Sequence, residues 1–365
     1  MTIIEKIKIV NKLLSLLHVF LLIGFIVNAQ DPSFSQVENT LMYSHPSFNS
    51  RDYHYNIGWA SLVQWPRVPG GFNTGFLTVN FNLPYKLSLG LSYLRDQEGI
   101  GNIGVLITDE PKGIVKYMSA FKKGKDGMGQ FLTFAWSFGV ISKHINSQEL
   151  VFSDQIDPVS GISDHSALVK EKKSFFDTDA SINFFVKNIN FPFLIAFSGH
   201  HLTEPNESLF GIDQPESKLS RRLVFTLCSR QLWEKKIKSL NLDFIAQIEF
   251  QRQLSKMTIG VVPGFISSEN NKFSLGFLNT SKYNFNRENT NSFVLDLGFH
   301  HKNNFANKNV YYTLNISWAI PYSGLGLQSA GTFELTYNLF FSKFSYLFKH
   351  GADCPEINDA EWTKY

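Results

Sequence analysis

The sequence predicts an all-β protein: a transmembrane, antiparallel, up-and-down β-barrel of the bacterial outer membrane with about fourteen strands. The chain of 365 residues is rich in aromatic residues (15%, including 35 Phe) and has only 18% charged residues, against about 25% in typical globular domains. Beyond residue 30, no apolar run approaches the roughly 20 residues of a membrane-spanning helix. Apolar and polar residues instead alternate along the chain, and the first residues resemble an export signal.

Residues 1–29 are expected to be a secretory signal peptide. Three lysines precede an apolar stretch, residues 13–27, and the small residue Ala29 ends the segment. A basic region, an apolar core and a small-residue cleavage site in this order are typical of exported proteins. An N-terminal membrane anchor is the alternative. Because no Cys follows Ala29, a lipid anchor is not expected there.

The alternation has a period of two and therefore predicts strands. The segment VYYTLNISW, for example, sets Leu314 and Ile316 on one face and Asn315 and Ser317 on the other. Apolar faces of this kind are expected to contact lipid, and the opposite faces to line a polar lumen. Fourteen such segments are found near residues 53–65, 71–83, 86–96, 103–121, 130–145, 175–188, 191–202, 221–233, 240–252, 257–267, 272–282, 292–301, 309–320 and 331–341.

The connections predict an orientation in the membrane. The two longest, residues 146–174 and 203–220, both follow odd-numbered segments, whereas several connections after even-numbered segments are short. Bacterial outer-membrane barrels have short periplasmic turns and longer external loops. The expected organisation is a signal peptide at 1–29, a periplasmic N-terminal segment at 30–52, a barrel at 53–341 and a periplasmic tail at 342–365.

A soluble β-sandwich or β-propeller is the structural alternative. The polar faces of the segments carry Asp243, Glu249, Asp296 and Glu334. A wet lumen tolerates such side chains, whereas the core of a sandwich does not. The barrel is therefore favoured.

Charge and cysteine usage limit the possible ligands. The formal net charge is +3, too small a basic excess to suggest a nucleic-acid partner. Cys228 and Cys354 lack the spacing of a metal site. We expect Cys228 to face the lumen and Cys354 to lie beyond the last strand, so no bridge between them is expected. No metal and no cofactor are predicted.

No catalytic residue is predicted, because no nucleophile, zinc or phosphate-loop motif occurs. The densest ligand-like group is His200, His201 and Glu204. Adjacent residues on a strand point to opposite faces, so the two histidines are not expected to bind one ion. The group is interpreted as a polar strand end at the external rim, and the protein as a non-enzyme. The residues expected to contact a partner lie in the two longest loops and are Asp154, Asp157, Pro158, Glu204 and Asn206.

Several local motifs, in order along the chain, resemble the PorP/SprF family of the Bacteroidota type IX secretion system. The chain departs from the common family pattern at residues 45–47 (HPS), where members often have an Asn-Pro-Ala-like segment. Residues 67–70 (RVPG) in the first external loop also differ, which leaves any partner of that region open. The motifs that carry the resemblance are Gln30-Asp31-Pro32-Ser33-Phe34-Ser35-Gln36, Gln64-Trp65-Pro66, Gly90-Leu91-Ser92 with Asp96, residues 150–161, residues 199–208 and Cys354-Pro355.

The resemblance implies an outer-membrane component of type IX secretion. It implies a role in secretion and in localising or anchoring large adhesin-type cargo at the cell surface, linked to gliding in motile species. The implied partners are outer-membrane lipid, the cargo adhesin and secretion components that include a periplasmic peptidoglycan-binding lipoprotein.

A passive porin or small-solute transporter remains the alternative function, suggested by the polar lumen. Fourteen strands lie between the eight that fill their own lumen and the 16–18 of open porins, so barrel size does not decide between the two functions.

Overall fold

The computed structural model describes most of the chain between residues 31 and 341. The predicted signal peptide (1–29), the predicted tail (342–365) and Cys354 lie outside the described residues. The described ranges are 31–48, 54–83, 86–100, 106–123, 129–145, 156–157, 161–162, 172–187, 192–209, 218–232, 240–251, 254–268, 271–284, 290–305, 308–323 and 326–341.

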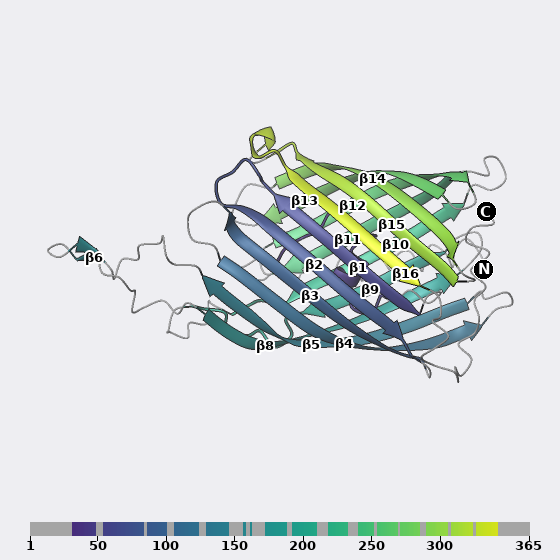
Figure 1. The fold of residues 1–365 in the computed structure, drawn as a ribbon, viewed down its shortest axis with the longest axis horizontal. Helices are drawn as coiled ribbons and strands as arrows, with labels where there is room; N and C mark the ends of the chain where they lie inside the picture. The colour runs from purple at the N-terminus through teal and green to yellow at the C-terminus, as the bar shows by residue number, and fades with distance from the viewer. Residues whose placement is uncertain are drawn as a thin grey trace, which may run out of the picture.

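Fourteen strands form one closed antiparallel barrel, as the alternation predicts (Figure 1). Each strand pairs with its neighbours in the chain, and β1 closes the barrel against β16, with Tyr55 opposite Phe341 and Gln64 opposite Thr332. The strands are β1 (Tyr55–Gln64), β2 (Gly71–Asn82), β3 (Leu87–Ile100), β4 (Leu106–Lys123), β5 (Gly129–Ile145), β8 (Lys172–Lys187), β9 (Phe193–His200), β10 (Arg222–Leu232), β11 (Leu240–Gln251), β12 (Leu254–Ser268), β13 (Asn271–Asn284), β14 (Thr290–Phe305), β15 (Lys308–Pro321) and β16 (Thr332–Phe341).

Four short elements complete the described structure. A helix, α2 (Leu41–Ser44), precedes the barrel, and a 3-10 helix, η4 (Gly326–Ser329), lies between β15 and β16. Strands β6 (Ile156–Asp157) and β7 (Gly161–Ile162) pair with each other outside the barrel sheet. No described helix is long and apolar enough to cross a bilayer.

The two faces of each strand differ as the sequence predicts. On β15, Leu314 and Ile316 are 39% and 55% exposed on the outside, whereas Asn315 and Ser317 are almost fully buried inside. Large apolar side chains on other strands, such as Trp136 and Leu91, share the outer surface. Since an exposed apolar band is stable only against hydrocarbon, the outside of the barrel is a lipid-facing surface.

The two ends of the barrel differ in their connections. Residues 146–171 join β5 to β8 and residues 201–221 join β9 to β10 at the same end, which we call the long-loop end. At the opposite, short-turn end, β12 and β13 are joined by residues 269–270 and β14 and β15 by residues 306–307. Helix η4 lies at the long-loop end (Figure 1).

Candidate functional site

The lumen of the barrel is occupied by the chain's own residues 31–48, which we call the plug. The backbone N–H of Asp31 donates to Oε1 of Gln251 (3.0 Å), the last residue of β11 at the long-loop end. At the other end of the plug, Nζ of Lys116 on β4 donates to the carbonyl of Phe48 (2.8 Å). The plug therefore runs from the long-loop end through the lumen toward the start of β1.

This position corrects one expectation. Residues 30–52 were expected to form a periplasmic segment, but their described part, residues 31–48, lies inside the barrel. The physical reason is that the lumen-facing polar side chains supply hydrogen-bond partners that an irregular backbone needs when it leaves water. The two-residue period identifies the polar face but not what covers it.

Barrel side chains bind the plug mainly through its backbone. The carboxylate of Glu334 accepts hydrogen bonds from the Ser35 N–H (2.7 Å), the Ser35 hydroxyl (2.7 Å) and the Gln36 N–H (3.1 Å). Side chains of β8, β9, β12 and β16 donate to plug carbonyls: Lys256 to Phe34 (2.6 Å), Asn338 to Asn39 (3.1 Å), Ser198 and His200 to Ser44 (2.5 and 2.9 Å) and Asn183 to Ser47 (2.6 Å). Because the donors come from strands all around the barrel, the plug is held from every side.

Apolar contacts add to this binding. Phe34 packs in a buried cluster with residues of β1, β2 and β3, while Val37 and Leu41 pack in a second cluster with residues of β9 and β11 to β15. All three plug side chains are buried. Burying a side chain of this size contributes about 1.5–3 kcal/mol, so the plug is a packed part of the folded barrel.

A charged cluster surrounds the start of the plug at the long-loop end. Its members come from the plug, β4, β8, β9, β10 and the residue that follows β9: Asp31, Glu110, Lys112, Asp177, Asp179, His200, His201 and Arg222. Lys112 is central: its ammonium lies 2.9 Å from Asp177 and 2.8 Å from Asp179, and it also pairs with Glu110. Arg222 pairs with Asp31 (3.4 Å) and donates a hydrogen bond to the hydroxyl of Tyr43 (2.6 Å).

His201 joins the plug to the barrel wall. Its Nδ1 lies 2.8 Å from a carboxylate oxygen of Asp177, and its Nε2 lies 2.8 Å from a carboxylate oxygen of Asp31. Burial disfavours the charged imidazolium, but the two carboxylates outweigh this and raise the pKa of His201 to about 10. Burial likewise opposes ionisation of Asp31, yet His201 and Arg222 hold its pKa well below the usual value. The pair is therefore ionised at neutral pH.

The expectation that His200 and His201 point to opposite faces does not hold. Strand β9 ends at His200, and His201 adopts a positive φ of 56°, so both side chains are buried inside. Glu204 does not join them: it lies near the surface and pairs with Arg221 (3.2 Å). Only the two histidines of the expected group are brought together.

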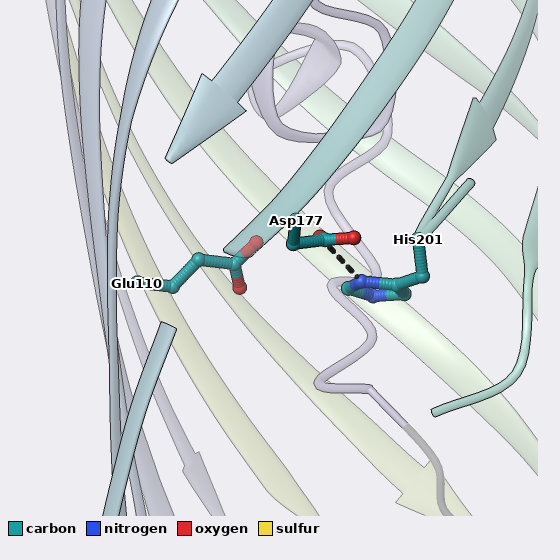
Figure 2. A group of neighbouring side chains, drawn as sticks. All are labelled: Glu110, Asp177 and His201. Atoms are coloured by element: carbon teal, nitrogen blue, oxygen red, sulfur yellow. Dashed lines mark hydrogen bonds and ion pairs between the residues drawn. The ribbon is translucent and has the colours of Figure 1, made fainter. Parts of the chain in front are cut away.

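Three of the cluster's residues could offer ligand atoms to a metal ion. Figure 2 shows Glu110, Asp177 and His201 pointing toward one another, and one ligand atom of each lies within 4.8 Å of the others. However, the ammonium of Lys112 already pairs with both carboxylates, and both nitrogens of His201 are engaged. A divalent ion would have to displace these cations, so the arrangement favours an ion-pair network over a metal site.

The same geometry does not favour acid–base or nucleophilic chemistry. Since both ring nitrogens of His201 bind carboxylates, neither is available to take a proton from a substrate. The nearby hydroxyl of Ser137 donates to Asp179 (2.7 Å) and that of Thr203 to Asp177 (3.0 Å). The cluster thus serves as an electrostatic anchor for the plug. The absence of catalytic residues remains a prediction.

The structure separates the residues expected to contact a partner. Asp154 and Pro158 lie outside the described residues. Asp157 pairs with Gly161 in the β6–β7 hairpin, which stands apart from the barrel (Figure 1). Asn206 forms a bridge to Lys218 within the connection between β9 and β10 and accepts a hydrogen bond from Lys173 (3.2 Å). These loop residues therefore remain candidates.

Sequence reasoning missed the plug and the charged cluster. The signal that could have indicated them is the number of ionisable residues on lumen faces, including Lys112, Asp177 and Asp179 beside the predicted Glu334. Such charges need partners once they leave water, and the N-terminal segment provides some of them: Asp31 for His201, and the N–H groups of Ser35 and Gln36 for Glu334.

Comparison with solved structures finds outer-membrane barrels. A monoaromatic hydrocarbon channel, CymD, shares 10% identity with a TM-score of 0.40, over 88% of this chain and 98% of that one. A FadL homologue of Pseudomonas aeruginosa shares 11% identity with a TM-score of 0.43, over 87% and 99% of the two chains. Omp33 of Acinetobacter baumannii shares 10% identity with a TM-score of 0.36, over 80% and 98%. No curated protein matches the chain.

The family comparison is more specific. The model of the family described as "Type IX secretion system membrane protein PorP/SprF" matches residues 26–339. This range includes the plug and almost all of the barrel, and the match agrees with the resemblance found in the motifs. The chain therefore belongs to the PorP/SprF family and is an outer-membrane component of type IX secretion.

Proposed function

We propose that the protein acts by binding and not by conducting solutes: it supports type IX secretion and localises or anchors large adhesin-type cargo at the cell surface. The observation that carries the proposal is the plug. Residues 31–48 fill the lumen and are hydrogen-bonded from all sides, which leaves the ends and loops of the barrel as the surfaces for partners.

The alternative, a passive porin, is disfavoured by the same observation. Two cavities beside the plug have volumes of about 30 and 60 Å³, enough for a few water molecules. Neither gives a polar solute a continuous wide path. We expect purified protein in planar bilayers to show little or no steady conductance, and a large, stable conductance would favour the porin.

The partners follow from the orientation we propose. We assign the long-loop end to the cell exterior, because outer-membrane barrels carry their longer loops there. The cargo adhesin would then contact the connections that contain Asp154, Asp157, Pro158, Glu204 and Asn206. The short-turn end would face periplasmic secretion components, including a peptidoglycan-binding lipoprotein, and in motile species the role would serve gliding.

Surface proteomics of a deletion strain tests the role. Deleting the gene should remove one large protein from the cell surface while most type IX cargo is still secreted. Loss of all cargo would instead indicate a core part of the secretion machine. An unchanged surface proteome would contradict the proposal.

A loop replacement tests the contact. Exchanging residues 150–161 for a Gly/Ser loop of equal length should leave barrel assembly intact, since loops contribute little to strand pairing, but should reduce adhesin display. As a control, the periplasmic connection 233–239 receives the same treatment. Normal display with the first loop and loss with the second would move the contact to the periplasmic side.

A further inference from the structure

Two lysines lie side by side inside the long-loop end, away from the charged cluster. Lys256 on β12 and Lys282 on β13 are direct partners in the strand register, and both line the same cavity within the barrel. Like charges opposite each other on neighbouring strands are destabilising, more so away from bulk water. Such a pair is stable when negative charge lies nearby.

A carboxylate lies in direct contact with only one of the two lysines, Lys256. Lys256 donates to the hydroxyl of Ser33 (2.5 Å) and the carbonyl of Phe34 (2.6 Å), and it lies 3.5 Å from Glu249. Its three N–H groups are therefore used. Among the described residues, none forms a hydrogen bond or ion pair with the ammonium of Lys282, a residue that lines the cavity.

The cavity is lined by many side chains that can donate hydrogen bonds. It has a volume of about 60 Å³, several times the 10–15 Å³ that one water molecule needs. No carboxylate belongs to its described lining. Four further polar side chains of the lining make no hydrogen bond with the rest of the described chain, and they come from β1, β14 and β16: Gln64, Thr290, Ser292 and Thr332.

We propose that this cavity binds one phosphate-type oxyanion, either free inorganic phosphate or the phosphate headgroup of a lipid. A single ammonium with several hydroxyl and amide donors matches an anion that has three or more acceptor oxygens, and lysine commonly binds phosphate as a point charge. A carboxylate has two oxygens and would leave more of these donors without a partner.

The bound anion would also stabilise the plug. Ser33 and Ser35 of the plug line the same cavity as Lys282 and Thr332 of the wall. An anion there would connect the plug with β13 and β16 and shield the charge of Lys282 from Lys256. Since it would bind only the folded, plugged barrel, it should raise the unfolding temperature of the protein.

The binding test uses the full mature protein in detergent, with inorganic phosphate as the probe and ³¹P NMR titration and calorimetry as readouts. Lys282→Gln should weaken phosphate binding at least tenfold, whereas Lys282→Arg should retain it within about threefold. The matched control is Lys272→Gln, because Lys272 lies on the same strand near the opposite end and already pairs with Asp243 (3.7 Å). It should change binding less than twofold.

Further measurements distinguish free phosphate from a lipid headgroup as the source of the anion. Phosphorus analysis and lipid mass spectrometry of purified wild type should find one phosphorylated lipid per barrel, absent from Lys282→Gln, if the source is a headgroup. Saturable phosphate binding without that lipid indicates the free anion. If Lys282→Gln fails the heat-modifiability test for folding, phosphate-dependent melting of wild type and Lys282→Arg decides.

Three results would overturn the proposal. One is the absence of both saturable phosphate binding and retained lipid in wild type. The second is an equal loss of binding in Lys272→Gln and Lys282→Gln. The third is full competition by acetate at the same concentration as phosphate, which would assign the cavity to a carboxylate.

Discussion

The Nε2 atom of His201 lies 2.8 Å from a carboxylate oxygen of Asp31, and this contact joins the plug to the wall of the barrel. Asp31 is the first described residue of the plug, and His201 directly follows β9. On its other side, His201 binds Asp177 of β8. One imidazolium thus couples the plug to two parts of the barrel that are distant in sequence from it.

Replacing His201 should loosen the plug. His201→Gln removes the cation that Asp31 and Asp177 share, while Arg222 and Lys112 still pair with these carboxylates. We therefore expect a destabilisation below the roughly 3–5 kcal/mol of a buried charge left with no partner. We expect protease cleavage within residues 31–48 and intermittent conductance in planar bilayers. The control is Glu204→Gln, which removes a surface pair worth about 0–1 kcal/mol and should change neither. Equal behaviour of the two variants would show that His201 does not anchor the plug.

The anchor should depend on pH in a defined direction. The pKa of His201 is raised from 6.5 to about 10, so its contribution to stability is fully present below pH 6.5 and is lost as the pH rises through about 10. The pKa of Asp31 is lowered, so its contribution is present above its ordinary value of 3.8 and is lost as the pH falls further.

We therefore expect wild type to be closed at neutral pH, with conducting events that become more frequent between about pH 8 and 10.5. His201→Gln, which lacks the titrating group, should show a high event frequency with little change over the same range. A wild-type frequency that is flat up to pH 10.5, or one that rises on mild acidification to pH 6, would contradict this assignment.

Removing the plug should open the lumen without destroying the barrel. Deletion of residues 31–48 removes no strand and leaves all strand pairs in place. Each lost Phe34, Val37 or Leu41 contact lowers stability by about 1.5–3 kcal/mol, so the heat-modifiable form should persist with a lower melting temperature. Conductance should become steady. A control that replaces Leu325 with Gly should stay closed, and a closed deletion variant would mean that something else fills the lumen.

The barrel itself follows from the sequence because its pattern is local. Alternation places Leu314 outside and Asn315 inside regardless of the rest of the chain, and the observed strand ends differ from the expected ones by only a few residues. The plug has no such pattern. Its only helix, α2, is one turn long, and residues of the plug bind partners up to 300 residues away in the sequence, as Gln36 does with Thr336. Contacts of that kind depend on which strands meet around the lumen.

The inward turn of His201 escapes prediction for a related reason. The rule that neighbouring side chains point to opposite faces applies only within a strand. β9 ends one residue earlier, and a positive φ at His201 returns its side chain to the lumen. The two-residue pattern indicates where a strand is but does not give the backbone angle of the residue after it.

The lipid-facing register can be tested at Leu314. Leu314→Arg should cost on the order of 2–4 kcal/mol, because a charge near the membrane midplane is poorly solvated. Leu314→Phe, the matched apolar control, should be nearly neutral. Heat modifiability and urea unfolding in detergent and in lipid vesicles provide the measurement. If arginine were as well tolerated as phenylalanine in vesicles, the outer face of β15 would have to be reassigned.

Cys228 reports on the plug from inside the lumen. It is partly buried and packs against the apolar cluster that contains Val37 and Leu41. In a Cys354→Ser background, where Cys228 is the sole thiol, we expect slow labelling by a charged maleimide in the intact protein and at least tenfold faster labelling after deletion of residues 31–48.

The same position bears on the disulfide prediction. A bridge requires Cα atoms within about 7 Å, so Cys354 could reach Cys228 only by entering a lumen that the plug already fills. Non-reducing peptide mapping of the wild type should therefore recover both cysteines as free thiols. Recovery of a Cys228–Cys354 peptide would mean that the C-terminal residues share the lumen with the plug.

In the maleimide experiment, fast labelling of Cys228 in the intact barrel would mean that the plug leaves the lumen on the time scale of the reaction.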